Sequence, residues 1–266
     1  VLSIFREPVS IDALAEQNLD IDTLDSLVEQ GLARQVDSEI YDVHDLIREF
    51  LLRSIDNQTK FGLHAKCSNW YKKSSQTPGY TIELIFHLLS SDNMAEAASL
   101  IVEDGRTLIS QGHMELLGLI DSITLEDIPK EMLANIFQFK GEILSLLGRF
   151  EDAKAAFGTA QEQALKVKNH SIQAEALSAL ADISLKQGNL DESLTMHKEA
   201  LEIFIKQKDA VGAARSYNNM GYLLRRKNDS SKAIESYSEV ERILDENDDP
   251  ELISSQLILA RSLMDL

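Results

Sequence analysis

The sequence repeats three related stretches at a fixed interval: Gly148-Arg149-Phe150-Glu151-Asp152-Ala153, Gly188-Asn189-Leu190-Asp191-Glu192-Ser193 and Asn228-Asp229-Ser230-Ser231-Lys232-Ala233. Each begins 40 positions after the one before, at residues 148, 188 and 228. The same interval relates Gly141 to Ala181 and Gly221, Phe157 to His197 and Tyr237, and Ala160 to Ala200 and Val240. A period of this length is typical of supersecondary units that stack on one another.

Each unit contains two helical patterns around a short turn. The Gly or Asn that opens each stretch can adopt the left-handed conformation that ends a helix. A helix pair of this kind cannot bury its apolar stripe alone, so several pairs must stack. We therefore predict a mainly α fold with an α-solenoid over residues 131–266, rather than an irregular helical bundle. From about Glu251 another first helix begins, which leaves the last repeat incomplete.

This pattern resembles the tetratricopeptide repeat over roughly residues 132–266. The usual period of that repeat is about 34 residues, and the longer spacing resembles the extended version found in regulators. The resemblance implies antiparallel helix hairpins that form a curved trough. It also implies that the first helix of each hairpin supplies the inner wall, where a partner binds.

Composition excludes several classes of function. Lys and Arg number 26 against 44 Asp and Glu, which gives a net charge of −18. Such a chain repels phosphate backbones and is a poor non-specific ligand for nucleic acid. No apolar run approaches the ~20 residues that a membrane helix needs. The single cysteine, Cys67, excludes an internal disulfide and favours a cytoplasmic location.

Residues 1–56 have the outline of a winged-helix-like domain. Helical patterns at about 11–17 and 21–30 precede two β-like runs at 32–36 and 40–43, and a helix follows at about 45–54. The helix that would enter DNA carries Asp22, Asp25 and Glu29 and no basic residue. A DNA-binding transcription regulator is therefore only a lower alternative.

The stretch Tyr41-Asp42-Val43-His44-Asp45-Leu46-Ile47-Arg48-Glu49-Phe50-Leu51 resembles the Met-His-Asp segment of STAND-class signal-transduction ATPases. Val43 replaces the Met of that segment, whereas His44 and Asp45 match it. The resemblance implies that His44 contacts a phosphate of ADP bound to a core outside this chain. The alternative is that His44 and Asp45 only begin a helix.

Residues 57–130 are predicted to form an irregular helical region outside the 40-residue register. Its segment 87–98 resembles the degenerate repeat that follows the winged helix in the same regulators. The predicted organisation is therefore 1–56, 57–130 and 131–266. We expect the chain to be a piece of a longer protein, continued at both ends.

No motif for catalysis occurs in the sequence. The phosphate-binding pattern G-x-x-x-x-G-K-[ST] is absent, because no Gly is followed by Lys. No His pair has the i, i+4 spacing of a metalloprotease, and no nucleophile signature occurs. We predict that this chain is not an enzyme and holds no cofactor or metal.

A basic end of the predicted trough is the candidate partner site. It is formed by residues of one face of the third first helix: Arg215, Asn218, Asn219, Tyr222, Arg225 and Arg226. Such a face would suit an acidic peptide, another domain of the same protein or an anionic small ligand. The alternative is that the arginines pair with Glu175 and Asp182.

The sequence thus favours a regulatory and sensor fragment of a STAND-class ATP-dependent signalling protein. Its repeat arm would bind a protein partner or a small inducer, and its winged helix would couple binding to the nucleotide switch. A stand-alone repeat scaffold for protein–protein interaction is the alternative.

Overall fold

The computed structural model describes residues 1–74 and 77–246. The predicted helix from about Glu251 lies outside these residues. The chain divides into two compact units, Val1–Ile128 and Pro129–Leu266.

The first unit begins with a small three-stranded sheet and its helices. In chain order these elements are the 3-10 turn η1 (Leu2–Ile4), β1 (Val9–Ser10), α1 (Ile11–Ala15), α2 (Ile21–Glu29), β2 (Arg34–Asp37), β3 (Ile40–Asp42) and α3 (Asp45–Ser54). Strand β3 lies between β1 and β2 and is antiparallel to both. Three helices and the β2–β3 hairpin occur where the sequence predicts them. Strand β1 was not predicted, since two residues are too few to show an alternating pattern.

The remainder of the first unit is helical. It contains α4 (Asn57–Lys73), α5 (Pro78–Ser90), α6 (Met94–Ser110), α7 (Leu116–Asp121) and the 3-10 turn η2 (Leu125–Asp127). Helix α5 is central to this region, because it contacts α4, α6 and α7. Its apolar side chains Ile85 and Leu88 are fully buried.

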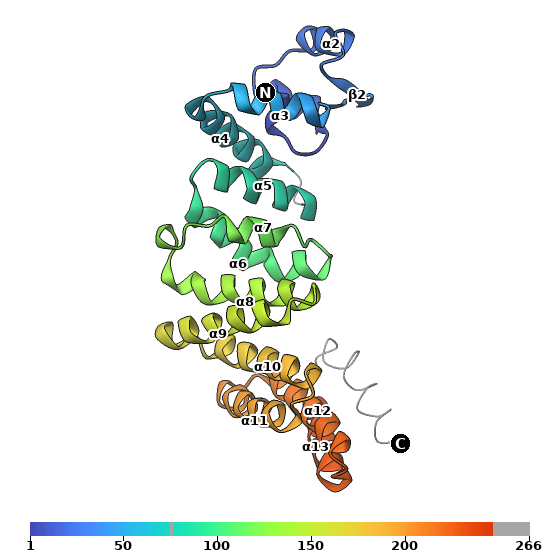
Figure 1. Ribbon diagram of the computed structural model, residues 1–266, viewed down its shortest axis with the longest axis vertical. Coiled ribbons are helices and arrows are strands. Elements are labelled where there is room, and N and C mark those ends of the chain that lie inside the picture. The colour runs from blue at the N-terminus through green and yellow to red at the C-terminus, as the bar shows by residue number, and fades with distance from the viewer. Residues whose placement is uncertain (75–76, 247–266) are drawn as a thin grey trace. The chain divides into compact units, whose positions relative to one another are not determined.

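Between residues 130 and 246, the second unit is a row of three antiparallel helix hairpins (Figure 1). Its helices are α8 (Lys130–Leu146), α9 (Phe150–Val167), α10 (His170–Lys186), α11 (Leu190–Gln207), α12 (Ala210–Arg226) and α13 (Ser230–Glu246). Each helix contacts the next along the chain. The structure therefore confirms the predicted solenoid and excludes an irregular bundle.

The three turns of the repeats have the predicted left-handed backbone. Gly148, Gly188 and Asn228 have φ values of 75°, 86° and 60°. Each stops the first helix of its hairpin, and the chain then reverses into the second helix. Gly and Asn adopt this conformation more readily than other residues, so they favour the turns of the three hairpins at these positions.

Within each hairpin a small residue on the first helix faces a ring on the second. A methyl group added to Gly141 would lie 2.6 Å from ring atoms of Phe157, and one added to Gly221 would lie 2.5 Å from the ring of Tyr237. The middle hairpin has Ala181 and the smaller ring of His197 at the equivalent positions, and both residues are fully buried. Alanine, which is larger than glycine, thus stands opposite the histidine ring, which is smaller than the rings of phenylalanine and tyrosine.

Candidate functional site

The candidate site lies on helix α12, which carries all six residues predicted from the sequence (Figure 1). Their spacing of three or four residues places them along one side of the helix. The side chains of Arg215 and Arg226 are exposed, whereas Asn219, Tyr222 and Arg225 are half-buried. Asn218 is buried, with 6% of its surface exposed. The helix therefore presents cations over a layer of less exposed polar groups.

Asn219 connects the site to the preceding repeat. Its Nδ2 donates a hydrogen bond of 3.1 Å to Oδ1 of Asp182 on α10. The same carboxylate oxygen lies 3.3 Å from Nε2 of the buried His197 on α11. Asp182 is itself half-exposed, so a carboxylate and an amide occupy neighbouring first helices on the accessible side of this pair.

A cation also lies over an aromatic ring at the end of α12. The guanidinium carbon of Arg226 is 5.9 Å from the centre of the Tyr222 ring. At that distance the contact is a weak cation–π interaction, worth about 0.5–1 kcal/mol at an exposed site. It orients Arg226 along the helix while its hydrogen-bond donors stay accessible.

Buried polar side chains recur at one position of each first helix. Gln138 on α8, Ser178 on α10 and Asn218 on α12 are separated by 40 residues and are 2%, 5% and 6% exposed. Within the described residues, Gln138 Oε1, Ser178 Oγ and Asn218 Oδ1 have no hydrogen-bond partner. Helix α10 contacts both α8 and α12, so these atoms belong to one continuous row of helices. A buried polar atom without a partner is unfavourable, and such atoms recur at one position of the repeat.

The first unit holds the other predicted site residue, His44. It is the exposed N-cap of α3, and its Nδ1 accepts a hydrogen bond of 3.4 Å from the backbone N–H of Leu46. The two residues before His44 are held by packing and by hydrogen bonds. Val43 is buried, and Asp42 accepts hydrogen bonds from Arg34 and Arg48. His44 therefore stands at a rigid corner between β3 and α3, with its ring in solvent.

The described residues contain no group of three or more His, Cys, Asp or Glu side chains that could hold a metal ion. No helix among them is sufficiently long and apolar to span a membrane. Cys67 is buried, and burial raises the pKa of its thiol to about 12, so it is protonated at neutral pH.

The repeats match a known family. Two overlapping matches to the tetratricopeptide repeat model cover residues 132–206 and 173–246. These residues form tetratricopeptide repeats. Repeats of this type generally bind protein partners and are typically not catalytic. No curated protein matches the sequence.

Several solved structures resemble the chain. A STAND protein with a tetratricopeptide repeat sensor from Pyrococcus horikoshii is 17% identical, with a TM-score of 0.48, over 99% of this chain and 46% of that one. The N-terminal domain of stress-induced protein-1 from C. elegans is 21% identical, with a TM-score of 0.36, over 47% and 93%. The apo form of RapI is 11% identical, with a TM-score of 0.49, over 95% and 67%. This chain thus spans less than half of the Pyrococcus protein.

Sequence reasoning placed polar residues on the inner helices but missed which of them are buried without a partner. The 40-residue register aligns Gln138, Ser178 and Asn218, so the column itself could have been found. The sequence could not show that this column is buried, because burial depends on how tightly neighbouring first helices pack.

Proposed function

We propose that this chain is the regulatory and sensor part of a STAND-class ATP-dependent signalling protein. Its tetratricopeptide repeats bind a protein partner or a small inducer, and its N-terminal winged-helix-like domain couples that binding to a nucleotide switch outside the chain. The organisation 1–56, 57–130 and 131–266 and a cytoplasmic location belong to this proposal. The accessible cations and polar side chains along one side of α12 are the observation that carries the binding role.

The charges of α12 suggest the chemistry of the partner. Arg215, Arg225 and Arg226 lie on one helix that also carries the half-buried Asn219. An anionic group can therefore meet guanidinium ions while a neighbouring backbone group meets the Asn219 amide. An acidic peptide offers carboxylates and backbone N–H groups together. It satisfies both features at once, which makes it the preferred ligand among those that the sequence allows.

The triple variant Arg215→Ala/Arg225→Ala/Arg226→Ala tests this proposal. With a fluorescent peptide rich in Asp and Glu as the probe, we expect affinity to fall at least about tenfold, or about 1.4 kcal/mol. The dependence of binding on salt should become weaker. Arg242→Ala on α13, which removes an exposed arginine paired with Glu239 and Glu246, is the matched control and should bind as the native chain does. Equal affinity of the triple variant and the control would refute the proposed site.

The nucleotide role of His44 requires a variant that keeps its cap. Since Ser is a good N-cap, His44→Ser preserves the start of α3 but removes the imidazole. In the intact parent protein we expect ADP to dissociate about tenfold faster or more, as loss of a hydrogen bond to a charged group implies. Unchanged ADP release would leave His44 as a cap only. The alternative function is a stand-alone repeat scaffold. It predicts that ADP release is unchanged in His44→Ser and that the acidic peptide still binds the repeats.

DNA binding is the lower alternative for residues 1–56. Helix α2 carries Asp22, Asp25 and Glu29 and no basic residue. A gel-shift experiment at physiological salt should therefore detect no complex with duplex DNA. A specific shift would favour a transcription regulator instead.

A further inference from the structure

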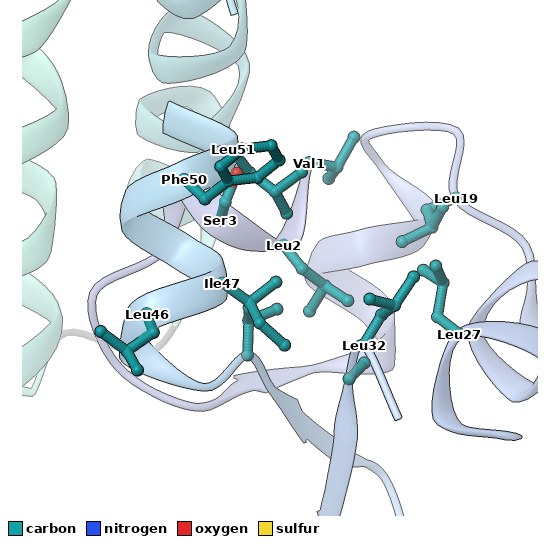
Figure 2. A pocket seen from close by; sticks show the side chains of 12 residues that line it. Val1, Leu2, Ser3, Leu19, Leu27, Leu32, Leu46, Ile47, Phe50 and Leu51 are labelled. Atoms are coloured by element: carbon teal, nitrogen blue, oxygen red, sulfur yellow. The ribbon is translucent and has the colours of Figure 1, made fainter. Parts of the chain in front are cut away.

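An apolar groove lies between η1, α2 and α3 in the first unit. Its volume is about 580 Å³, and eleven of its twelve lining residues are apolar, Ser3 being the exception. Figure 2 shows Leu46, Ile47, Phe50 and Leu51 of α3 on one side of this groove, and Leu19, Leu27 and Leu32 on the other. A cavity of this volume is within the range of sites that bind ligands.

Two apolar side chains on the α3 wall of the groove are largely uncovered within the described part of the chain. Leu46 and Phe50 are 72% and 70% exposed, and no residue of α3 is fully buried. Other lining residues are well packed, because Leu2, Ala33 and Val43 are almost completely buried. Contiguous exposed apolar side chains beside well-packed ones mark an interaction site in a folded protein.

The apolar lining of the groove favours a helical ligand over an extended one. An extended strand would bring unpaired backbone N–H and C=O groups into a groove whose walls are aliphatic and aromatic side chains. Each such group would be costly to bury. An α-helix satisfies its own backbone and presents only side chains, with apolar residues spaced three or four positions apart.

The charge of residues 1–60 further restricts the kind of partner that can bind. Residues 1–60 contain thirteen acidic residues and five basic ones. Four of the five basic side chains already form ion pairs: Arg6 with Glu83, Arg34 and Arg48 with Asp42, and Arg53 with Glu49. The segment that forms the groove therefore carries a strong net negative charge. It disfavours an anionic membrane and a second copy of this chain, whose net charge is −18.

We propose that this groove docks an amphipathic helix of a partner protein. One face of that helix carries Leu, Ile or Phe, and Lys or Arg residues flank the face. The apolar side chains fill the cavity and cover Leu46 and Phe50, whereas the cations lie against the acidic surroundings. This docking site is separate from the repeat surface on α12 and does not depend on a nucleotide switch.

Two designed helical peptides test the proposal against the full chain. They share one Leu stripe and differ only at the flanking positions, which are Lys in one and Glu in the other. By fluorescence anisotropy, we expect the Lys peptide to bind at least tenfold more tightly at low salt. The difference should shrink at high salt as the charges are screened. Equal affinity of the two peptides, or no binding by either, would overturn the proposal.

Matched variants locate the binding on the groove. Leu46→Ala/Phe50→Ala should weaken the Lys peptide at least tenfold without loss of helicity, since both side chains are mostly exposed. Phe61→Ala removes a 47%-exposed aromatic on α4 that does not line the groove, and it should bind as the native chain does. Two other outcomes count against a partner helix. A dimer that the double variant dissociates assigns the groove to a second copy, and binding to phosphatidylglycerol vesicles assigns it to a membrane.

Discussion

Replacement of Gly141 by alanine is expected to lower the free energy of unfolding by about 1–3 kcal/mol, the usual effect of overpacking. Alanine is the better helix former by about 1 kcal/mol, so helix propensity alone predicts the opposite sign. The added methyl group would lie 2.6 Å from Cδ1 and Cε1 of Phe157. The ring is fully buried between helices and cannot move aside without disturbing its neighbours. Urea denaturation followed by circular dichroism measures the effect.

Gly158 provides the matched control for this prediction. It lies one residue after Phe157 in α9, and an added methyl group there meets no atom within 4 Å. Gly158→Ala should therefore stabilise the repeat by about 0.5–1 kcal/mol. If Gly141→Ala also stabilises the protein, the close approach of α8 and α9 at this point is wrong.

The middle hairpin suggests how the defect can be repaired. Its equivalent pair is Ala181 with His197, so Gly141→Ala/Phe157→His reproduces a combination that the fold already accommodates. We expect the double variant to be more stable than the sum of the two single effects predicts, by about 0.5–3 kcal/mol of coupling. Strict additivity would show that the two positions do not contact each other.

Acidification is expected to destabilise the first unit through a buried pair of histidines. Nδ1 of His64 on α4 lies 2.8 Å from Nδ1 of His87 on α5, and both rings are buried. Nε2 of His87 is buried without a partner. One ring therefore donates its Nδ1–H to the Nδ1 of the other, which requires both imidazoles to be neutral. A further proton would place an unpaired charge in the core.

Burial lowers the pKa of both imidazoles. The pKa of His64 falls from 6.5 to about 4, mainly by desolvation and also through Lys60, and that of His87 falls to about 3 by desolvation, with His64 and Arg6 adding to the effect. The unfolded chain thus binds protons that the folded chain does not. The contribution of the two neutral histidines to the free energy of unfolding is fully present above pH 6.5. It is lost as the pH falls toward 4. Between pH 7.5 and 5 the loss is about 2 kcal/mol for each ring.

The variant His64→Phe/His87→Phe isolates this contribution. Its unfolding free energy should change less between pH 7.5 and 5 than that of the native chain, because surface carboxylates titrate alike in both. Burial raises the pKa of Glu83, and this residue is present in both proteins. His170→Asn, at an exposed position in the second unit, should keep the native pH profile. Identical profiles for the double variant and the native chain would contradict the buried pair.

The elements that the sequence predicts well are those specified by nearby residues. The turns at Gly148, Gly188 and Asn228 depend on the conformation of one residue each, and the hairpins between them follow from the apolar periodicity of single helices. The β2–β3 hairpin and α3 are local in the same way. Strand β1 differs, because Val9 and Ser10 form a strand only by pairing with Tyr41 and Ile40.

The candidate site follows the same division. The register alone places Arg215, Asn218, Asn219, Tyr222, Arg225 and Arg226 on one helix. It does not reveal that Asn219 donates a hydrogen bond to Asp182 of the preceding repeat, or that the amide of Asn218 is buried. The sequence left open whether the arginines pair with Glu175 and Asp182, and the described contacts of Asp182 are with Asn219 and His197.

By itself, the sequence determined the 40-residue repeat, the turn positions and the acidic character of the chain, because periodicity, left-handed turn residues and charge are properties of residue types and their spacing. Tertiary structure alone decided that His64 meets His87, that Gly141 makes room for Phe157 and that Leu46 and Phe50 stay exposed beside an apolar groove. These features depend on distances between helices, and such distances result from the packing of many side chains at once.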